Sequence, residues 1–187
     1  MLAPAQAGEI LKSADLVCSA EAVTQAVQRV AAEISCVLAA ENPLVLCVMS
    51  GAVVFSGQLL PLLNFPLDFD YLHLTRYGNA TSGGSIEWKV FPQASVAGRV
   101  VLIVDDILDE GHSMVEIRAR ALASGAARFY CAVLADKDIG RPKPMAADFV
   151  GVKVPNRYVF GFGMDVKGAW RNLPAIYALK VSEGVKA

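Results

Sequence analysis

Four carboxylates lie in one short segment, VVLIVDDILDEGHSM, which covers residues 100–114. They come directly after an apolar run that is typical of a buried strand: Asp105, Asp106, Asp109 and Glu110. A glycine follows them, and the next residues favour a helix. A turn between a strand and a helix can offer backbone N–H groups to a phosphate. The segment therefore combines an anion site with acids that need a hydrogen-bond donor or a cation.

The segment matches neither of two common nucleotide-binding motifs, the Walker A pattern G-x-x-x-x-G-K-S/T and the dinucleotide pattern G-x-G-x-x-G. The turn from Asp109 to Ser113 can still donate N–H groups and the Ser113 hydroxyl to one phosphate. Asp105 and Asp106 need donors, which a ribose 2′,3′-diol supplies, or a cation, which Mg²⁺ supplies. A ribose 5-phosphate that bears a pyrophosphate would meet both needs.

The elements that must position this segment follow an α/β pattern. A chain of 187 residues fits one domain, and 55% of its residues are hydrophobic. Periodicity and capping predict three helices, from the N-cap Ser19 up to Asn42-Pro43, over Val53–Leu63, and over Ser113–Ser124. Apolar runs predict five strands: Pro43–Met49, Leu67–Thr75, Ile86–Phe91, Arg99–Val104 and Arg128–Ala135. Beyond Asp136 we expect short irregular segments, because prolines interrupt the chain.

Composition argues against several classes of partner. The net charge is −1 and no basic run is present, which argues against nucleic acid. The apolar runs are too short to span a bilayer and no signal peptide is evident, which argues against a membrane. The cysteines lack metal-ligand spacing and lie in apolar segments: Cys18, Cys36, Cys47 and Cys131. We therefore expect reduced thiols and a cytoplasmic protein.

Several separated motifs resemble a known family. The acidic segment resembles the phosphoribosyl-pyrophosphate signature of the type I phosphoribosyltransferases, and the span from Leu44 to Val181 resembles their hypoxanthine-guanine branch. The matching motifs are VMSG, the TRYG loop, a lysine at a strand end, ADFVGVKVPNRYVFGFGMD and WRNLP. This resemblance implies a doubly wound, mostly parallel sheet in one domain, residues 1–187. It also implies a small hood subdomain from the N-terminal and C-terminal segments, and a flexible loop.

The resemblance implies the following activity and partners. The enzyme would transfer the phosphoribosyl group from 5-phosphoribosyl 1-pyrophosphate to a 6-oxopurine base, giving IMP or GMP in purine salvage, with Mg²⁺ as cofactor. Its partners would be these small molecules, not nucleic acid or membrane. The apolar composition of so small a chain further suggests subunit contacts, in a homodimer or homotetramer.

The family's roles can be assigned to matching positions. The ribose hydroxyls and magnesium would contact Asp105 and Asp106, and Asp109 would take the N7 proton of the purine. The 5′-phosphate would be held by residues of the turn: Glu110, Gly111, His112 and Ser113. Lys137 would donate to the 6-oxo group, which adenine lacks.

The remaining roles concern the base and the leaving group. Tyr158 would stack on the base, and Val159 would contact its edge through the backbone. Asp165 would bind a second magnesium, and Arg171 would grip the pyrophosphate. The first pyrophosphate loop would be Ser50-Gly51, after a cis peptide bond between Met49 and Ser50. Arg76 and Tyr77 would close over the site, as part of a Gly-rich loop spanning residues 76–84 that we expect to be flexible.

Each assignment has a structural alternative. The aspartate pair could be a solvated strand end, and Lys137 could pair with Asp136 or Asp138 at the surface. Tyr158 could belong to the core, and Arg171 could stack on an aromatic face. Two positions also depart from the family: Ser50 stands where many relatives carry Lys or Arg, and His112 where a basic or polar residue is common. The alternative function is a non-catalytic regulator of transcription or RNA that keeps the same fold.

Overall fold

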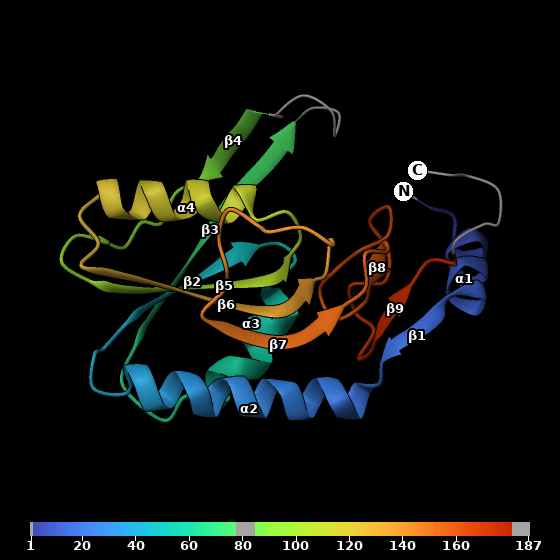
Figure 1. Cartoon of the computed structure of the whole chain (residues 1–187), viewed down its shortest axis with the longest axis horizontal. Helices are drawn as coiled ribbons and strands as arrows, with labels where there is room; N and C mark the ends of the chain where they lie inside the picture. Colours follow the sequence, from blue (N-terminus) through green and yellow to red (C-terminus); the bar gives the residue numbers. More distant parts are fainter. Residues whose placement is uncertain (1, 78–84, 181–187) are drawn as a thin grey trace.

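The apolar runs of the sequence form the centre of a six-stranded sheet in the computed structural model, which describes residues 2–77 and 85–180 (Figure 1). The strand order is β4-β3-β2-β5-β6-β7. All neighbours pair in parallel except β3 and β4, which are antiparallel. The strands are β2 (Leu44–Met49), β3 (Asp68–Tyr77), β4 (Ser85–Val90), β5 (Val100–Leu108), β6 (Arg128–Lys137) and β7 (Phe149–Val154).

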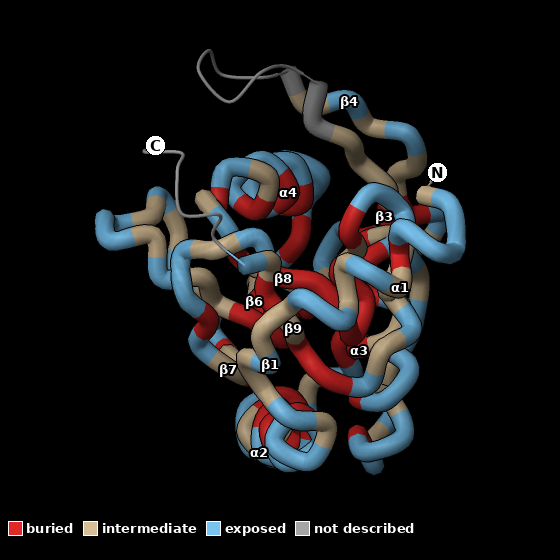
Figure 2. The backbone as a smooth tube through the Cα atoms, turned by 90° about the vertical axis from the view of Figure 1, so that its right-hand side faces the viewer, coloured by how far each residue is buried: buried red, intermediate tan, exposed pale blue. Residues whose placement is uncertain are grey.

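Helices cover both faces of this sheet. On one face lie α2 (Ala20–Leu38), α3 (Val53–Leu59) and a 3₁₀ turn (Leu60–Leu62), and on the other lies α4 (His112–Ala123). Alternate residues of β5 enter the two cores, with Leu102 on the α2 side and Ile103 on the α4 side. Figure 2 shows α2 and α4 on opposite sides of the sheet, each with buried residues along it. The expected doubly wound α/β fold is therefore confirmed.

The first core helix follows the predicted signals closely. Ser19 caps α2, since its side chain accepts a hydrogen bond from the Ala22 N–H at 3.2 Å. The predicted apolar stripe is buried at Val23, Val27, Val30, Ile34 and Leu38, whereas Val37 is exposed. The next predicted helix, 53–63, was too long as a single α-helix. Its α-helical part ends at Leu59 because Pro61 lacks the N–H that the helix would need, and a 3₁₀ turn follows.

Three features around the site differ from the predictions. Strand β5 continues through Leu108 and not only to Val104, so Asp105 and Asp106 lie within the strand and not beyond its end. Parallel pairing with β6, up to Leu108 opposite Asp136, stabilises this extension. Strand β6 likewise runs two residues further, to Lys137. The segment after Asp136 was expected to be irregular, but it forms β7 once it pairs with β6.

A second, three-stranded sheet joins segments that are far apart in the sequence. Its order is β1-β9-β8, from β1 (Asp15–Cys18), β9 (Ile176–Ala178) and β8 (Val159–Phe160). It lies beside α1 (Pro4–Ser13) in Figure 1. Strands this short have little local signal in the sequence, because their stability comes from partners that only the folded chain provides. Within the described residues, no helix is long and apolar enough to cross a membrane.

The close packing of β6 and β7 predicts a stability effect at Gly151. A methyl group added to Gly151 would overlap the Leu134 carbonyl oxygen of β6. We expect Gly151→Ala to lower the free energy of unfolding by about 1–3 kcal/mol, measured by urea denaturation.

The matched control is Gly57→Ala in α3, where nothing lies within 4 Å of the added atom. This change should be neutral or slightly stabilising, because alanine favours the helix. Equal effects of the two substitutions on unfolding would contradict the packing argument.

Candidate active site

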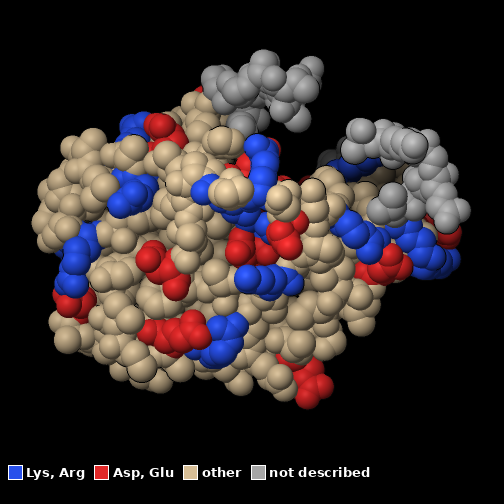
Figure 3. All heavy atoms as spheres, in the orientation of Figure 1, with Lys and Arg blue, Asp and Glu red and all other residues tan. Residues whose placement is uncertain are grey.

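The predicted site residues gather where strands β5 and β6 end and α4 begins. A cavity of about 470 Å³ lies there, lined by residues 107–114 together with Asp105, Lys137, Ile139, Arg141 and Asn156. Open α/β sheets bind ligands at this carboxyl edge. Figure 3 shows acidic and basic side chains gathered near the middle of this face of the molecule. The site therefore combines carboxylates with cations in a polar hollow.

The turn into α4 has the geometry of an anion site. Gly111 is the N-cap residue and has a φ of 84°, in the left-handed region that favours glycine. His112 and Ser113 open the 12-residue helix, so their N–H groups lie in its first turn, where backbone donors lack partners within the helix. Glu110 forms an ion pair with Arg141 at 2.9 Å. The turn that was predicted to hold a phosphate thus forms one wall of the cavity.

The aspartate pair is crowded and electrostatically unfavourable. The Asp106 N–H donates to Asp105 Oδ1 at 2.9 Å. Burial raises the pKa of Asp105 well above its usual value, and the charge of Asp106 raises it further. Burial also raises the pKa of Asp106, while Asp105 and Arg171 oppose that shift. Both side chains are half-buried and the Asp106 carboxylate lies against Gly51, so the pair is not a fully solvated strand end.

Two glycines, Gly51 and Gly163, let the loop after β2 approach this pair. The expected cis bond between Met49 and Ser50 is present, and Ser50 is exposed while Gly51 is buried. A side chain on Gly51 would overlap the Asp106 carboxylate, and one on Gly163 would overlap the Gly51 carbonyl oxygen. Only residues without a Cβ allow these three segments to meet.

Asp109 and Lys137 meet across the site. Lys137 Nζ lies 2.6 Å from Asp109 Oδ2, and its side chain is 12% exposed. The alternative partner Asp136 is instead bound by Lys143 at 2.5 Å. Lys137 is therefore not a surface lysine paired with its sequence neighbour, and it faces the candidate proton acceptor.

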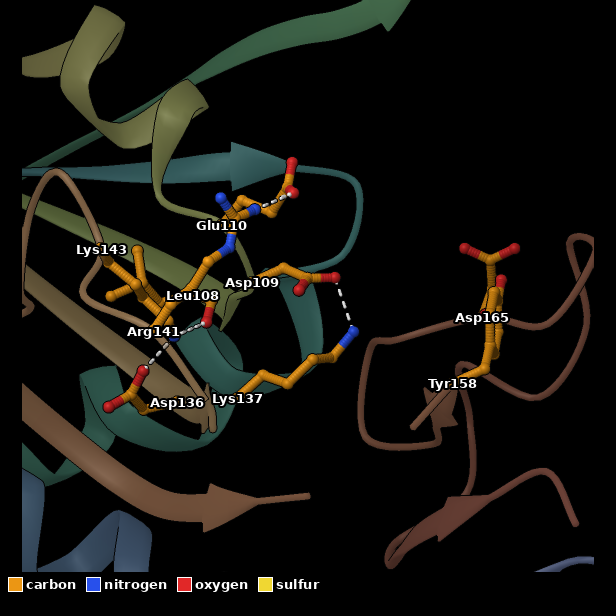
Figure 4. Close-up of polar contacts among 9 residues, drawn as sticks. All are labelled: Leu108, Asp109, Glu110, Asp136, Lys137, Arg141, Lys143, Tyr158 and Asp165. Carbon is orange, nitrogen blue, oxygen red and sulfur yellow. Dashed lines mark hydrogen bonds and ion pairs between the residues drawn. The ribbon is translucent and has the colours of Figure 1, made fainter. Parts of the chain in front are cut away.

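A second cavity, of about 210 Å³, lies beside the Asp109–Lys137 pair. Tyr158 and Asp165 form the wall opposite this pair (Figure 4). The cavity is lined by Asp106, Ile107, Asp109, Lys137, Tyr158, Val159, Met164 and Asp165. Tyr158 is 52% exposed and its hydroxyl donates to the Asp165 carbonyl oxygen at 3.0 Å, so the ring is not core packing. The apolar residues Ile107 and Met164 were missed by the sequence analysis. Ile107 could have been found from the sequence, because it stands between Asp106 and Asp109 in the acidic segment.

Arg171 lies at the edge of this wall. It binds Asp165 Oδ1 at 2.6 Å and donates to the Gly163 carbonyl oxygen at 2.5 Å. The neighbouring Trp170 donates its indole N–H to the Ala7 carbonyl oxygen. Arg171 is therefore held by the loop that also carries Asp165, within the electrostatic range of Asp106.

Other predicted features are less fully described. Arg76 and Tyr77 end β3, but their side chains and residues 78–84 lie outside the described residues, so the expected flexible loop stays a prediction. Among residues 2–77 and 85–180, no group of three or more His, Cys, Asp or Glu could hold a metal ion alone. A cation at this site would need ligands from a substrate or water.

Comparisons with known proteins agree with this geometry. A model of the phosphoribosyl transferase domain matches residues 15–167. The hypoxanthine-guanine-xanthine phosphoribosyltransferase of Tritrichomonas foetus is 34% identical over 161 residues, 86% of this chain and 88% of that protein. The hypoxanthine-guanine phosphoribosyltransferase of Streptococcus thermophilus is 34% identical over 143 residues, 76% of this chain and 79% of that one.

Solved structures show the same likeness. One of a hypoxanthine-guanine-xanthine phosphoribosyltransferase has a TM-score of 0.77 at 31% identity, covering 91% of this chain and 97% of its own. One of a hypoxanthine-guanine phosphoribosyltransferase from Bacillus anthracis has a TM-score of 0.83 at 25% identity, covering 89% and 98%. With its acidic strand end, phosphate turn and matching fold, the chain belongs to the phosphoribosyltransferase family and has the type I fold.

Proposed function

We propose that the protein is a purine-salvage enzyme, a hypoxanthine-guanine phosphoribosyltransferase. It transfers the 5-phosphoribosyl group from 5-phosphoribosyl 1-pyrophosphate to N9 of hypoxanthine or guanine, giving IMP or GMP and pyrophosphate. The observation that carries this proposal is the Asp109–Lys137 pair, which faces Tyr158 across one small cavity beside the phosphate turn. An acid–base group, a donor for a 6-oxo group and an aromatic platform are what this reaction needs.

The contacts of the described residues support a sequence of roles. The turn 110–113 would hold the 5′-phosphate, which leaves the ribose over Asp105 and Asp106 at the strand end. The base would lie between Tyr158 and Lys137, with Ile107, Val159 and Met164 lining the cavity. The N9 lone pair forms the bond to C1′ as the bond from C1′ to pyrophosphate oxygen breaks. The N7 proton passes to the Asp109 carboxylate.

The carboxylates at this edge fit magnesium, a hard cation that prefers oxygen ligands. Burial raises the pKa of both adjacent carboxyls, and the charge of Asp106 raises that of Asp105 further, so a cation would stabilise the ionised pair. Asp165 would contact a second ion, and the remaining ligands would come from ribose hydroxyls, pyrophosphate and water. When bound, magnesium would offset negative charge on the departing pyrophosphate.

Arg171 and Ser50-Gly51 would receive the pyrophosphate. Arg171 presents a guanidinium that can bind phosphate oxygens at two points, once it exchanges Asp165 for the ligand. The exposed Ser50 offers a hydroxyl where many relatives carry a cation, so Arg171 supplies more of the positive charge. Arg76 and Tyr77 would close over this end of the site and exclude water.

The wider setting follows the same proposal. The small sheet and α1 would form the hood of the domain, and the protein would act as a homodimer or homotetramer. Exposed apolar side chains on neighbouring elements, Phe69 and Tyr71 of β3 and Val53 of α3, support subunit contacts. All four cysteines are free thiols, which supports a cytoplasmic location. A regulator without chemistry would not need Asp109, Lys137 and Tyr158 around one cavity.

Asp109→Asn tests the proposed proton acceptor. The amide keeps an oxygen for Lys137 but cannot take the N7 proton, so turnover should fall by about two to four orders of magnitude. Binding of phosphoribosyl pyrophosphate should change little. Steady-state kinetics with hypoxanthine and magnesium would measure both.

The control is Asp138→Asn, at an exposed carboxylate on the same sheet edge, which accepts a hydrogen bond from the Gly140 N–H at 3.0 Å. It should keep turnover near that of the wild type. Near wild-type turnover of Asp109→Asn as well would remove Asp109 from the mechanism.

Lys137→Gln tests the reading of the base. Loss of a charged donor to the 6-oxo group should lower kcat/KM for hypoxanthine about 10- to 100-fold, because such hydrogen bonds contribute roughly 1.5–3 kcal/mol. The wild type should use adenine poorly, since its amino group would leave the ammonium unpaired.

A matched control is Lys153→Gln on the exposed side of β7. It should leave the preference for hypoxanthine over adenine unchanged. If the wild type turned over adenine and hypoxanthine equally well, Lys137 would not be the residue that reads the base.

Asp105→Asn tests the cost of the acidic pair in the ligand-free protein. The folded-state pKa of Asp105 is raised, so the wild type loses stability as pH rises from the ordinary carboxyl value, about 4, through the raised value. The asparagine variant escapes this loss. Its advantage in free energy of unfolding should therefore be small near pH 4 and grow toward pH 8, while activity falls.

Urea denaturation with a chelator present, repeated across this pH range, would measure the difference. Asp138→Asn serves again as the exposed control and should show no such trend. A stability difference for Asp105→Asn that is the same at every pH would refute this account of the pair.

A further inference from the structure

We infer that Lys143 is a positioning residue for the phosphoribosyl transfer: its ammonium ties together the two strand ends that carry Asp109 and Lys137, and neutralises the acid next to Lys137. This inference rests on the proposed function, because it assigns Lys143 a task through those two residues. Lys143 itself has no role in the family pattern described above. It lies in the segment that connects β6 to β7.

The contacts of Lys143 are short and shielded from solvent. Its Nζ donates to the Leu108 carbonyl oxygen at 2.6 Å and to Asp136 Oδ1 at 2.5 Å. Its side chain is only 12% exposed, and that of Asp136 is 27% exposed. Figure 4 shows these dashed contacts beside the Asp109–Lys137 pair. Removing one partner of a shielded ion pair costs more free energy than removing one partner of an exposed pair, because the remaining charge is poorly solvated.

The sheet register gives these contacts their meaning. Leu108 and Asp136 are partners in the parallel β5–β6 pairing, and each is the last residue before a proposed functional one. Asp109 follows Leu108, and Lys137 follows Asp136. The ends of β5 and β6 are therefore joined twice at neighbouring positions. Lys143 bridges Leu108 and Asp136, and one residue further along, Lys137 pairs with Asp109. The first fixes the backbone from which the second projects.

Electrostatics gives Lys143 a second task. If the Lys143 ammonium were removed, the partly buried carboxylate of Asp136 would lose this cation. Asp136 directly precedes Lys137 in the sequence. Two flexible cations would be left to compensate Asp136: the exposed Lys153, its partner in the β6–β7 pairing, and Lys137, whose ammonium the purine needs. Lys143 thus keeps Lys137 directed toward Asp109 and the cavity.

The same segment also supports the phosphate turn. Pro144 and the Met145 carbonyl oxygen lie 3.5 Å from where a side chain on Gly111 would begin. Arg141 ties the segment to Glu110, but its side chain is 64% exposed, so this outer ion pair restrains the segment less. The contacts of Lys143, which are shielded from solvent, therefore restrain this segment more than those of Arg141 do.

Lys143→Met tests the inference, because methionine keeps an apolar stem and removes the charge. We expect kcat/KM for hypoxanthine to fall about 10-fold or more, mainly through a higher KM for the base. The KM for phosphoribosyl pyrophosphate should change less. Lys143→Arg, which keeps the cation, should restore much of the loss.

A double variant separates positioning from general damage. Asp136→Asn in the Lys143→Met background removes the carboxylate that would attract Lys137, so kcat/KM for hypoxanthine should recover several-fold. If Lys143 only stabilised the fold, the double variant would be no better than the single one. Lys12→Met is the control. It removes a lysine whose side chain is 76% exposed and pairs with Glu9 on α1, so it should change neither KM.

A crystal structure of Lys143→Met gives a readout that does not depend on activity. We expect the Lys137 ammonium to turn from Asp109 toward Asp136. An unchanged Lys137–Asp109 contact, or an unchanged KM for hypoxanthine in an active enzyme, would overturn the inference. A wild-type protein that turned over no purine would instead refute the proposed function, and the crystal structure would still decide whether Lys143 positions Lys137.

Discussion

The site depends on the parallel pairing of β5 with β6 beyond the apolar part of both strands. The paired register continues to Leu108 and Asp136, although the last residues of β5 include two aspartates. Backbone hydrogen bonds between strands do not depend on side-chain type, so the pairing can carry acids into the edge of the sheet. Because both strands stop at the same level, Asp109 and Lys137 emerge side by side. The proposed contacts of Asp109 and Lys137 with the base start from this register.

The close approach of other segments completes the site around this edge. The loop at Gly51 lies against Asp106, and Gly163 lies against Gly51, so residues from three distant parts of the sequence share one wall. The cost is electrostatic. Burial raises the pKa values of Asp105 and Asp106, and the charge of Asp106 raises that of Asp105 further, so ionising this pair in the empty site has a free-energy cost.

Local signals in the sequence predicted the central sheet well. The cap at Ser19, the stripe of α2 and the apolar runs of β2, β5 and β6 act over a few residues, so pattern alone finds them. Strand ends were placed too early, because pairing and not hydrophobicity extends β5 to Leu108. The strands β1, β8 and β9 have four, two and three residues, and only long-range pairing defines them.

The site itself was predictable by residue type but not by pairing. The family resemblance implied roles for Asp109, Lys137 and Asp165, and the fold brings all three to one cavity. It did not indicate which ions pair in the empty protein. Lys143 had no signal, because its partners Leu108 and Asp136 are 35 and 7 residues away and become neighbours only through the register of the sheet.

With the proposed roles, these pairings would make substrate binding an exchange of partners. Lys137 is bound to Asp109 and Arg171 to Asp165, so each cation must leave a carboxylate when the base and pyrophosphate enter. The exchange is favourable only if the ligand offers an acceptor of similar strength. A 6-oxo group offers one to Lys137, while an amino group does not. In the proposed enzyme, discrimination against adenine would therefore include the contact that Lys137 gives up, and not only the one it fails to gain.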